Sequence, residues 1–205
     1  PSSSFIIAIT WLTVADSPVN LHLIPEGAVF KPGLPFSFLI VTETPDNQPV
    51  ETRVDYEVTY LDEDFGDIDS EIGHVDSRNG TGQLELDPPR DAVALSIEAY
   101  ADGARAEQEL EASYSPSGNF IHVEQVSDGV PQAGDDITFT VHSTSEARTF
   151  YYEVVSRDRI VFSSYTRDNE FSFQTTPAMA PASRLLVYQV LPNSEVAADY
   201  IPFDV

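Results

Sequence analysis

The chain has 205 residues, no cysteine, and a formal net charge of −24, because 34 acidic residues face only 10 basic ones. These counts exclude a thiol nucleophile, a cysteine metal site and an internal disulfide in this sequence. They also make nucleic acid and anionic membranes poor partners, since both attract clustered lysine and arginine. Hydrophobic residues make up 41% of the chain, enough for buried cores, yet no run of about 18 apolar residues could span a membrane.

Lys31 is the only lysine, and the other nine bases are arginines. Many acids with almost no lysine is the composition expected of a protein adapted to high salt, where screening weakens the repulsion between like charges. This is a hypothesis about habitat. It predicts that the fold is lost at low ionic strength.

The N-terminal stretch FIIAITWLTV, residues 5–14, is apolar and contains the only tryptophan, Trp11. It has no positively charged leader, so it predicts a buried strand rather than a signal peptide. The chain starts with proline, which suggests that it is cut from a longer protein. Residues 1–18 are therefore expected to form a strand of a preceding domain or an N-terminal extension.

The stretch FKPGLPFSF, residues 30–38, predicts the entry to a strand, because the alternation of Phe36 and Phe38 leads directly into it. Its prolines suit a strand entry or an edge, and Gly33 suits a turn that a residue with a Cβ would resist. No phosphate-binding motif surrounds Lys31. The sequence therefore predicts a structural role for this stretch and no basic site.

Most of the remaining chain alternates with a period of two, which is typical of half-buried antiparallel strands. The stretch ARAEQELEA, residues 104–112, has helical propensity but offers only Leu110 as a large apolar anchor, so a strand is favoured. The other alternating runs are RVDYEVTY (53–60), QLEL (83–86), DITFTV (136–141) and EFSFQ (170–174).

The segment SYSPSGN, residues 113–119, separates two parts of similar length, each the size of one seven-stranded sandwich. We therefore predict an all-β chain of two tandem fibronectin- or immunoglobulin-like antiparallel β-sandwiches. The first is expected over residues 19–114 and the second over residues 115–205. So short a linker predicts a fairly fixed angle between them.

The histidines do not show metal-ligand spacing: His22, His122 and His142 lie in predicted strands, and His74 lies near a loop. His122 shares a strand face with Glu124, but no third ligand is evident, so an ordinary cross-strand histidine is favoured. The sequence contains no G-x-S-x-G elbow, no P-loop and no G-x-G-x-x-G. We therefore predict no catalytic residue and no cofactor.

The acidic run DEDFGDIDSE, residues 62–71, is the most tempting metal site, because Asp67, Asp69 and Glu71 loosely resemble a calcium loop. The glycine and closing glutamate of an EF-hand are not at the required offsets, so a solvated hairpin loop is favoured over calcium. Asn79-Gly80-Thr81 is a complete glycosylation sequon, but Asn-Gly is also a good type I′ turn, and the turn is the favoured reason for these residues.

Several stretches together show a family resemblance. FKPGLPFSFLIV followed by PDNQPV resembles the opening of the fourth macroglobulin domain of the α2-macroglobulin and complement-like thioester proteins. SPSGNFIHVE, YYEVVSRDRIV and MAPASRLLVYQVLPNSEVAADYIPFDV resemble the fifth such domain in order and spacing. The resemblance covers residues 19–205.

This resemblance implies a non-catalytic scaffold fragment of a secreted or cell-surface protein that acts in protease inhibition or innate defence. Its partners would be neighbouring macroglobulin domains and, through the full-length protein, target proteases. The Gly-Cys-Gly-Glu-Gln thioester motif is absent from this chain, and the family's bait segment is expected in the following domain. The alternatives are an Ig-like adhesin, which could use calcium at residues 62–71, and, less favoured, a β-sandwich glycosidase.

Overall fold

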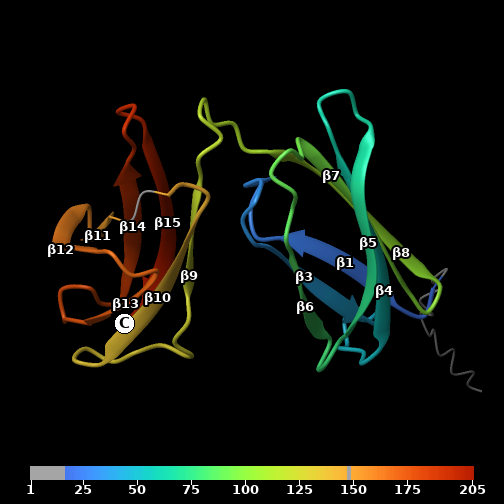
Figure 1. Cartoon of the computed structure of the whole chain (residues 1–205). Coiled ribbons are helices and arrows are strands. Elements are labelled where there is room, and N and C mark those ends of the chain that lie inside the picture. Colours follow the sequence, from blue (N-terminus) through green and yellow to red (C-terminus); the bar gives the residue numbers. More distant parts are fainter. Residues whose placement is uncertain (1–16, 147–148) are drawn as a thin grey trace, which may run out of the picture.

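The computed structural model describes residues 17–146 and 149–205, which form fifteen strands and no helix (Figure 1). No helix that is long and apolar enough to cross a membrane occurs in this part of the chain. The predicted all-β class with two β-sandwiches is confirmed. The strand predicted for residues 5–14 lies outside the described residues.

The first sandwich packs a three-stranded sheet, in the order β1-β3-β6, against a five-stranded sheet, in the order β2-β8-β7-β4-β5. All pairings are antiparallel except that of the short β2 with β8. Its core lies between the sheets and includes Phe38, Ile40, Val58 and Ile97, all fully buried. The strands are β1 (Asn20–Pro25), β2 (Val29–Phe30), β3 (Phe36–Glu43), β4 (Arg53–Leu61), β5 (Asp67–Asp76), β6 (Thr81–Leu86), β7 (Ala94–Ala101) and β8 (Ala104–Ala112).

The second sandwich packs a three-stranded sheet, in the order β13-β10-β9, against a four-stranded sheet, in the order β12-β11-β14-β15. Aromatic rings dominate its core: Phe139 stacks on Phe173 with ring centroids 5.7 Å apart, and the centroid of Phe203 lies 5.8 Å away, edge-on. The strands are β9 (Ile121–Gln125), β10 (Asp136–Ser143), β11 (Phe150–Ser156), β12 (Arg159–Thr166), β13 (Glu170–Gln174), β14 (Ala182–Val190) and β15 (Val196–Asp204).

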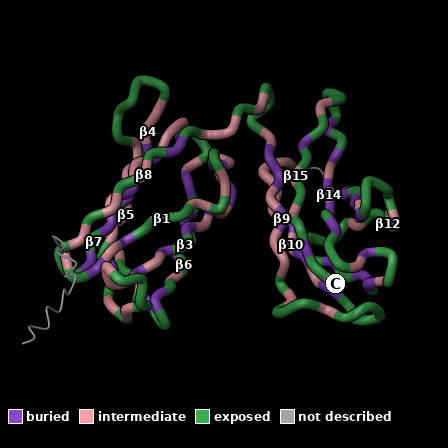
Figure 2. The backbone as a smooth tube through the Cα atoms, turned by 180° about the vertical axis from the view of Figure 1, so that it is seen from behind, coloured by how far each residue is buried: buried purple, intermediate pink, exposed green. Residues whose placement is uncertain are grey.

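The two cores are separate sets of residues, one between Leu21 and Leu110 and one between Ile121 and Phe203. Figure 2 shows buried residues interspersed along the strands of both sandwiches, with many exposed residues in the loops. Each sandwich thus has the core that an independently folding domain requires. The domain boundary between residues 114 and 115 stays a prediction.

The ambiguous segment ARAEQELEA forms β8, so the strand prediction is confirmed. Its register on β7 pairs Leu110 with Leu95, and both side chains are buried. Burial of this face outweighs helical propensity, because a helix here would bury only one large side chain.

His74 lies in β5 opposite Asp55, close to the end of the strand at Asp76. The expectation of a single solvated loop over residues 62–71 is wrong. The acidic run is a loop only over residues 62–66, and its second half belongs to β5. The cause is Ile68, which packs against the first core and draws the acidic residues on either side of it into the strand.

The Asn79-Gly80 turn joins β5 to β6 as the sequence predicts. Asn79 has φ +53° and Gly80 has φ +79°, and Arg78 and Thr81 exchange two backbone hydrogen bonds across them. Two consecutive positive φ angles define the type I′ hairpin turn.

The outer face of the five-stranded sheet carries a row of three glutamates. The register places Glu57 opposite Glu98 and Glu98 opposite Glu107. Arg105 lies 2.8 Å from Glu98 and 2.9 Å from Glu107. Arg105 therefore partly neutralises two of the three carboxylates, which face one another directly across the strands.

Added salt is therefore expected to stabilise the first sandwich. It weakens the repulsion among the three glutamates more than it weakens the attraction between the exposed Arg105 and its two partners. We expect the melting temperature to rise by several degrees between about 0.05 M and about 2 M NaCl. Glu57→Gln should reduce that rise, while Glu63→Gln in the exposed loop between β4 and β5 should leave it unchanged. A melting temperature that does not depend on salt would contradict both this prediction and the high-salt hypothesis.

Candidate functional site between the two sandwiches

The only lysine of the chain reaches from the first sandwich to the second. Lys31 Nζ lies 2.7 Å from Asp199 Oδ1 on β15 and donates a hydrogen bond of 2.9 Å to the backbone carbonyl of Ile121 on β9. Both charged side chains are largely covered, with 23% of Lys31 and 18% of Asp199 exposed. An ion pair this sheltered from water is stronger, and costs more to break, than one on an open surface.

The loop that carries Lys31 is held firmly by its neighbours in the sequence. Phe30 is fully buried in the first core. Gly33 adopts φ +77° and donates a hydrogen bond of 2.9 Å to the carbonyl of Pro88. The amide of Leu34 donates to the carbonyl of Lys31 itself. The backbone on both sides of Lys31 is thus fixed, which leaves its side chain free to point at the second sandwich.

His122 on β9 is the second element of the site, and its side chain is only 15% exposed. Its Nδ1 lies 3.5 Å from Asp199 Oδ2, and its Nε2 lies 3.3 Å from Glu124 Oε1 and 3.9 Å from Glu26 Oε1. Glu26 belongs to the first sandwich, so His122 faces carboxylates from both. The same Asp199 oxygen accepts a hydrogen bond of 3.0 Å from the amide of Val123.

His142 completes the group on the neighbouring strand β10, directly opposite His122, with the ring centroids 6.3 Å apart. Its Nε2 is buried, makes no hydrogen bond, and lies 3.5 Å from Glu124 Oε2. The interface ion cluster therefore comprises Glu26, Lys31, His122, Glu124, His142 and Asp199. Over residues 17–146 and 149–205, no three or more His, Asp or Glu side chains are arranged to hold a metal ion.

The ionisable groups of the cluster influence one another. Burial alone would raise the pKa of Asp199, but hydrogen bonds from His122 and Lys31 and the charge of Lys31 lower it below its usual value. Burial alone would lower the pKa of His122, but the hydrogen bond to Asp199 and the charge of Glu26 raise it overall. Burial raises the pKa of Glu26, which the charge of His122 only partly offsets.

Arg90 makes a second bridge between the sandwiches. It donates a hydrogen bond of 3.4 Å from Nη2 to the carbonyl of Thr144 in the second sandwich. Its stem covers Gly33, where an added Cβ would lie 2.6 Å from Arg90 Cγ. The glycine of the FKPG stretch therefore serves the interface as well as the turn.

Gly33→Ala is expected to destabilise the chain by about 1 kcal/mol more than Gly103→Ala in urea unfolding. Both positions have positive φ, so both substitutions cause the same backbone strain. An added Cβ at Gly33 would also overlap the side chain of Arg90, whereas nothing lies within 4 Å of a Cβ at Gly103. Equal losses for the two variants would show that the contact of Gly33 with Arg90 contributes nothing.

The linker between the sandwiches is also anchored. Ser115 Oγ donates a hydrogen bond of 3.0 Å to Glu195 in the turn between β14 and β15, and it accepts one of 3.2 Å from the amide of Asn119. The amide of Phe120 donates to Thr144 Oγ1 at 2.8 Å. The linker is thus tied to the second sandwich at several points and does not act as a free hinge.

The structure does not bring the calcium candidates together. Asp67, Asp69 and Glu71 lie along β5, where residues four apart are separated by roughly 13 Å, while calcium requires oxygens at about 2.5 Å from the ion. Glu71 also accepts a hydrogen bond of 2.6 Å from the hydroxyl of Tyr60. Burial and this bond to Glu71 raise the pKa of Tyr60 far above its usual value.

Asn79 is exposed on its turn, and its backbone N–H donates a hydrogen bond of 3.2 Å to Glu51 Oε1. Its side chain is open to solvent as a glycosylation acceptor requires, and glycosylation stays a prediction.

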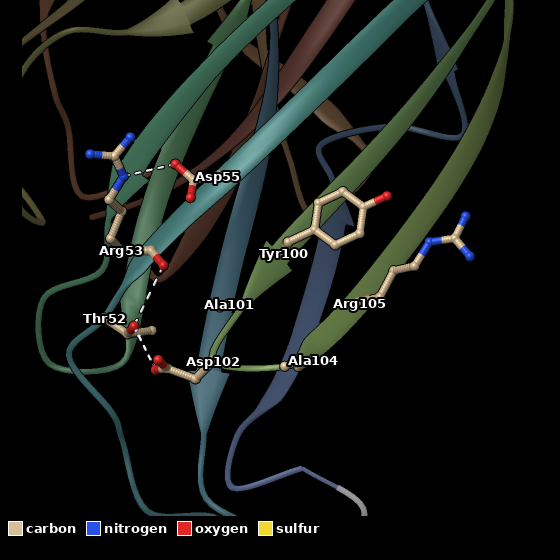
Figure 3. A pocket seen from close by; sticks show the side chains of 9 residues that line it. Thr52, Arg53, Asp55, Tyr100, Ala101, Asp102, Ala104 and Arg105 are labelled. Carbon is tan, nitrogen blue, oxygen red and sulfur yellow. Dashed lines mark hydrogen bonds and ion pairs between the residues drawn. The ribbon is translucent and has the colours of Figure 1, made fainter.

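An open groove lies at the far end of the first sandwich, formed by the start of β4 and the turn between β7 and β8 (Figure 3). Arg53 pairs with Asp55 at 2.7 Å, and the hydroxyl of Thr52 donates to Asp102 at 2.7 Å, so these polar groups are mutually satisfied. Tyr100 and Arg105 stand on neighbouring strands of the same groove. No residue predicted as a site from the sequence lines it.

The sequence pattern did not indicate the interface role of Lys31, because FKPGLPFSF was interpreted only as the entry to a strand. A usable signal was present in β15: Asp199 lies on the same strand face as Ala197, Ile201 and Phe203, which pack in the core. A carboxylate on the inner face of a strand requires a partner. The sequence does not show which of ten cations that partner is.

Comparisons with known proteins agree with the resemblance noted in the sequence. The family model described as the alpha-2-macroglobulin bait region domain matches residues 121–205. The complement C3 of the hagfish Eptatretus burgeri is 30% identical over 211 residues, which cover 95% of this chain and 13% of that protein. The chain is thus similar to members of the α2-macroglobulin and complement C3 family over nearly its whole length. The cobra venom factor of Naja kaouthia is 25% identical over 94% of this chain and 12% of its own length.

The chain spans only about an eighth of the length of the curated relatives it matches. Among solved structures, Escherichia coli alpha-2-macroglobulin activated by porcine elastase has a TM-score of 0.39 at 10% identity, over 91% of this chain and 20% of that one. A TM-score that low adds nothing to the family assignment. The matching family model is described by the bait region, yet the placement of the bait segment in the following domain stays a prediction.

Proposed function

We propose that this macroglobulin-family segment is a non-catalytic scaffold that holds two sandwiches at a fixed angle within a much longer extracellular protein. The observation that carries the proposal is the Lys31–Asp199 ion pair, at 2.7 Å and largely sheltered from solvent. The ionisable groups of the interface ion cluster face one another across the interface rather than into a pocket. Such an arrangement positions domains and offers no free nucleophile or base to a substrate.

The partners we propose are the neighbouring domains of the parent chain, which this segment would hold in place. A protease would meet the segment only as part of the whole protein. The function of the segment is then mechanical: the two sandwiches move as one rigid body when the parent protein rearranges. Protease inhibition and innate defence are both compatible with this role, and both belong to the parent rather than to the segment.

Small-angle X-ray scattering of the purified chain at mildly acidic pH tests the proposal. The wild-type profile is expected to fit one fixed arrangement of the two sandwiches. Lys31→Met keeps the aliphatic stem and removes the charge, so it should require an ensemble of arrangements. Arg53→Met, which removes an exposed cation far from the interface, is the matched control and should leave the profile unchanged. A wild-type profile that already requires an ensemble, or clear hydrolase turnover, would overturn the proposal.

A further inference from the structure

The interface ion cluster contains a group that changes charge near neutral pH. His122 has an ordinary pKa of 6.5, and it lies between Asp199 of its own sandwich and Glu26 of the other. Histidine is the side chain whose charge responds most readily to modest changes of pH around neutrality. The charge state of His122 therefore bears on the contact between the two sandwiches.

The balance of charges in the cluster depends on that histidine. When His122 is neutral, Glu26, Glu124 and Asp199 share one close cation, Lys31. When His122 is protonated, a second cation lies among the three carboxylates, 3.9 Å from Glu26 and 3.3 Å from Glu124. Protonation thus adds an attraction between His122 and Glu26 that opposes the repulsion between Glu26 and Glu124.

We infer that protonation of His122 locks the two sandwiches together and that its deprotonation loosens them, so that the angle between them is controlled by pH. This inference rests on the proposed scaffold function and adds a means of regulating it. The lock is ionic and reversible. It acts through the 3.9 Å contact of His122 with Glu26, because Glu26 is the only carboxylate of the cluster that comes from the first sandwich.

The pKa shifts of the cluster also favour a tighter contact between the sandwiches at low pH. The pKa of His122 is raised in the closed state, so its contribution is present at low pH and is lost as pH rises through that value. The raised pKa of Glu26 acts in the same direction. The pKa of Asp199 is lowered, so its contribution fails only as pH falls below its ordinary value of 3.8. The lock should hold at mildly acidic pH and weaken above pH 6.5.

The charged and titratable groups that face His122 are Glu26 and Lys31 from the first sandwich, Glu124 on β9, His142 on β10 and Asp199 on β15. His142 contacts Glu124 within the second sandwich, so its charge has little effect across the interface. His22 lies in the first sandwich, pairs with Glu43 at 3.5 Å, and is half exposed. It therefore provides a matched control histidine.

The experiment measures the distance between the two sandwiches as a function of pH. The chain has no cysteine, so Ser70→Cys on β5 and Ser163→Cys on β12, both exposed, give two unique sites for spin labels. Pulsed electron resonance would record the distance distribution at about pH 5.5 and about pH 8.5 in the labelled chain. The same labels would be placed in chains that carry His122→Gln, His22→Gln or Glu26→Gln.

The labelled wild-type chain and its His22→Gln variant are expected to show a narrow distribution at the lower pH and a broader one at the higher pH. His122→Gln, which cannot be protonated, should be broad at both. Glu26→Gln leaves the second sandwich intact and removes the carboxylate through which the lock acts, so its distance distribution should be the same at both pH values. This variant keeps the test valid should His122→Gln fold poorly. A distribution that is narrow at both pH values in the wild type overturns the switch alone. One that is broad at both overturns the scaffold function as well.

Discussion

Asp199→Asn is expected to destabilise the interface between the two sandwiches by about 2 kcal/mol. Breaking a fully buried ion pair costs roughly 3 to 5 kcal/mol, and this pair is partly exposed, so the loss is discounted. Asparagine keeps an oxygen for the amide of Val123 but no longer neutralises Lys31 or His122. The free energy of unfolding in urea, followed separately for each sandwich, measures the loss.

A double-mutant cycle separates this pair from its surroundings. Lys31→Met alone should cost a similar amount, because it leaves Asp199 with only His122 as its cation. The double variant Lys31→Met with Asp199→Asn should cost clearly less than the sum of the two single variants, since the groups touch. Strict additivity would mean that the 2.7 Å contact between Lys31 and Asp199 contributes no coupling energy.

Phe139→Ala is expected to cost about 3 to 5 kcal/mol and to unfold the second sandwich well before the first. Phe139 is fully buried and stacks on Phe171 and Phe173, so its removal leaves a cavity among rigid rings. A loss of that size lowers the melting temperature of a domain this small by more than about 12 °C. Hydrogen exchange resolved by residue would assign each transition to its sandwich.

The Phe139→Ala variant also tests the proposed boundary between residues 114 and 115. Phe38→Ala, in the core of the first sandwich, is the matched control and should lower the melting temperature of the first sandwich instead. If either substitution lowers the protection of both sandwiches equally, the chain unfolds as one unit and the division into two domains is wrong.

Much of the fold could be predicted because the strands obey a local rule. Val54, Val58 and Tyr60 alternate with polar residues, and the same alternation identifies β10 and β13. Burial of one face drives this pattern, so the sequence shows which face is inside. β5 was harder to predict, because it is an edge strand in which every residue is at least partly exposed.

The candidate site could not be predicted in the same way, because its members come from distant parts of the chain. Lys31 and Asp199 are 168 positions apart, and only the packing of the two sandwiches brings them together. A pattern with a period of two reports which side of a strand is buried, not what lies against a loop from another domain. The family resemblance helped to identify the parent, yet it gave Lys31 no role.

The most direct test of the account compares the orientations of the two sandwiches by residual dipolar couplings in weakly aligned solution at mildly acidic pH. The couplings of each sandwich yield an alignment tensor, and rigidly joined bodies share one. A common tensor is expected in the wild-type chain, and two different tensors are expected in Lys31→Met. Different tensors in the wild type, or a common tensor that survives Lys31→Met, would contradict the claim that this ion pair fixes the angle between the sandwiches.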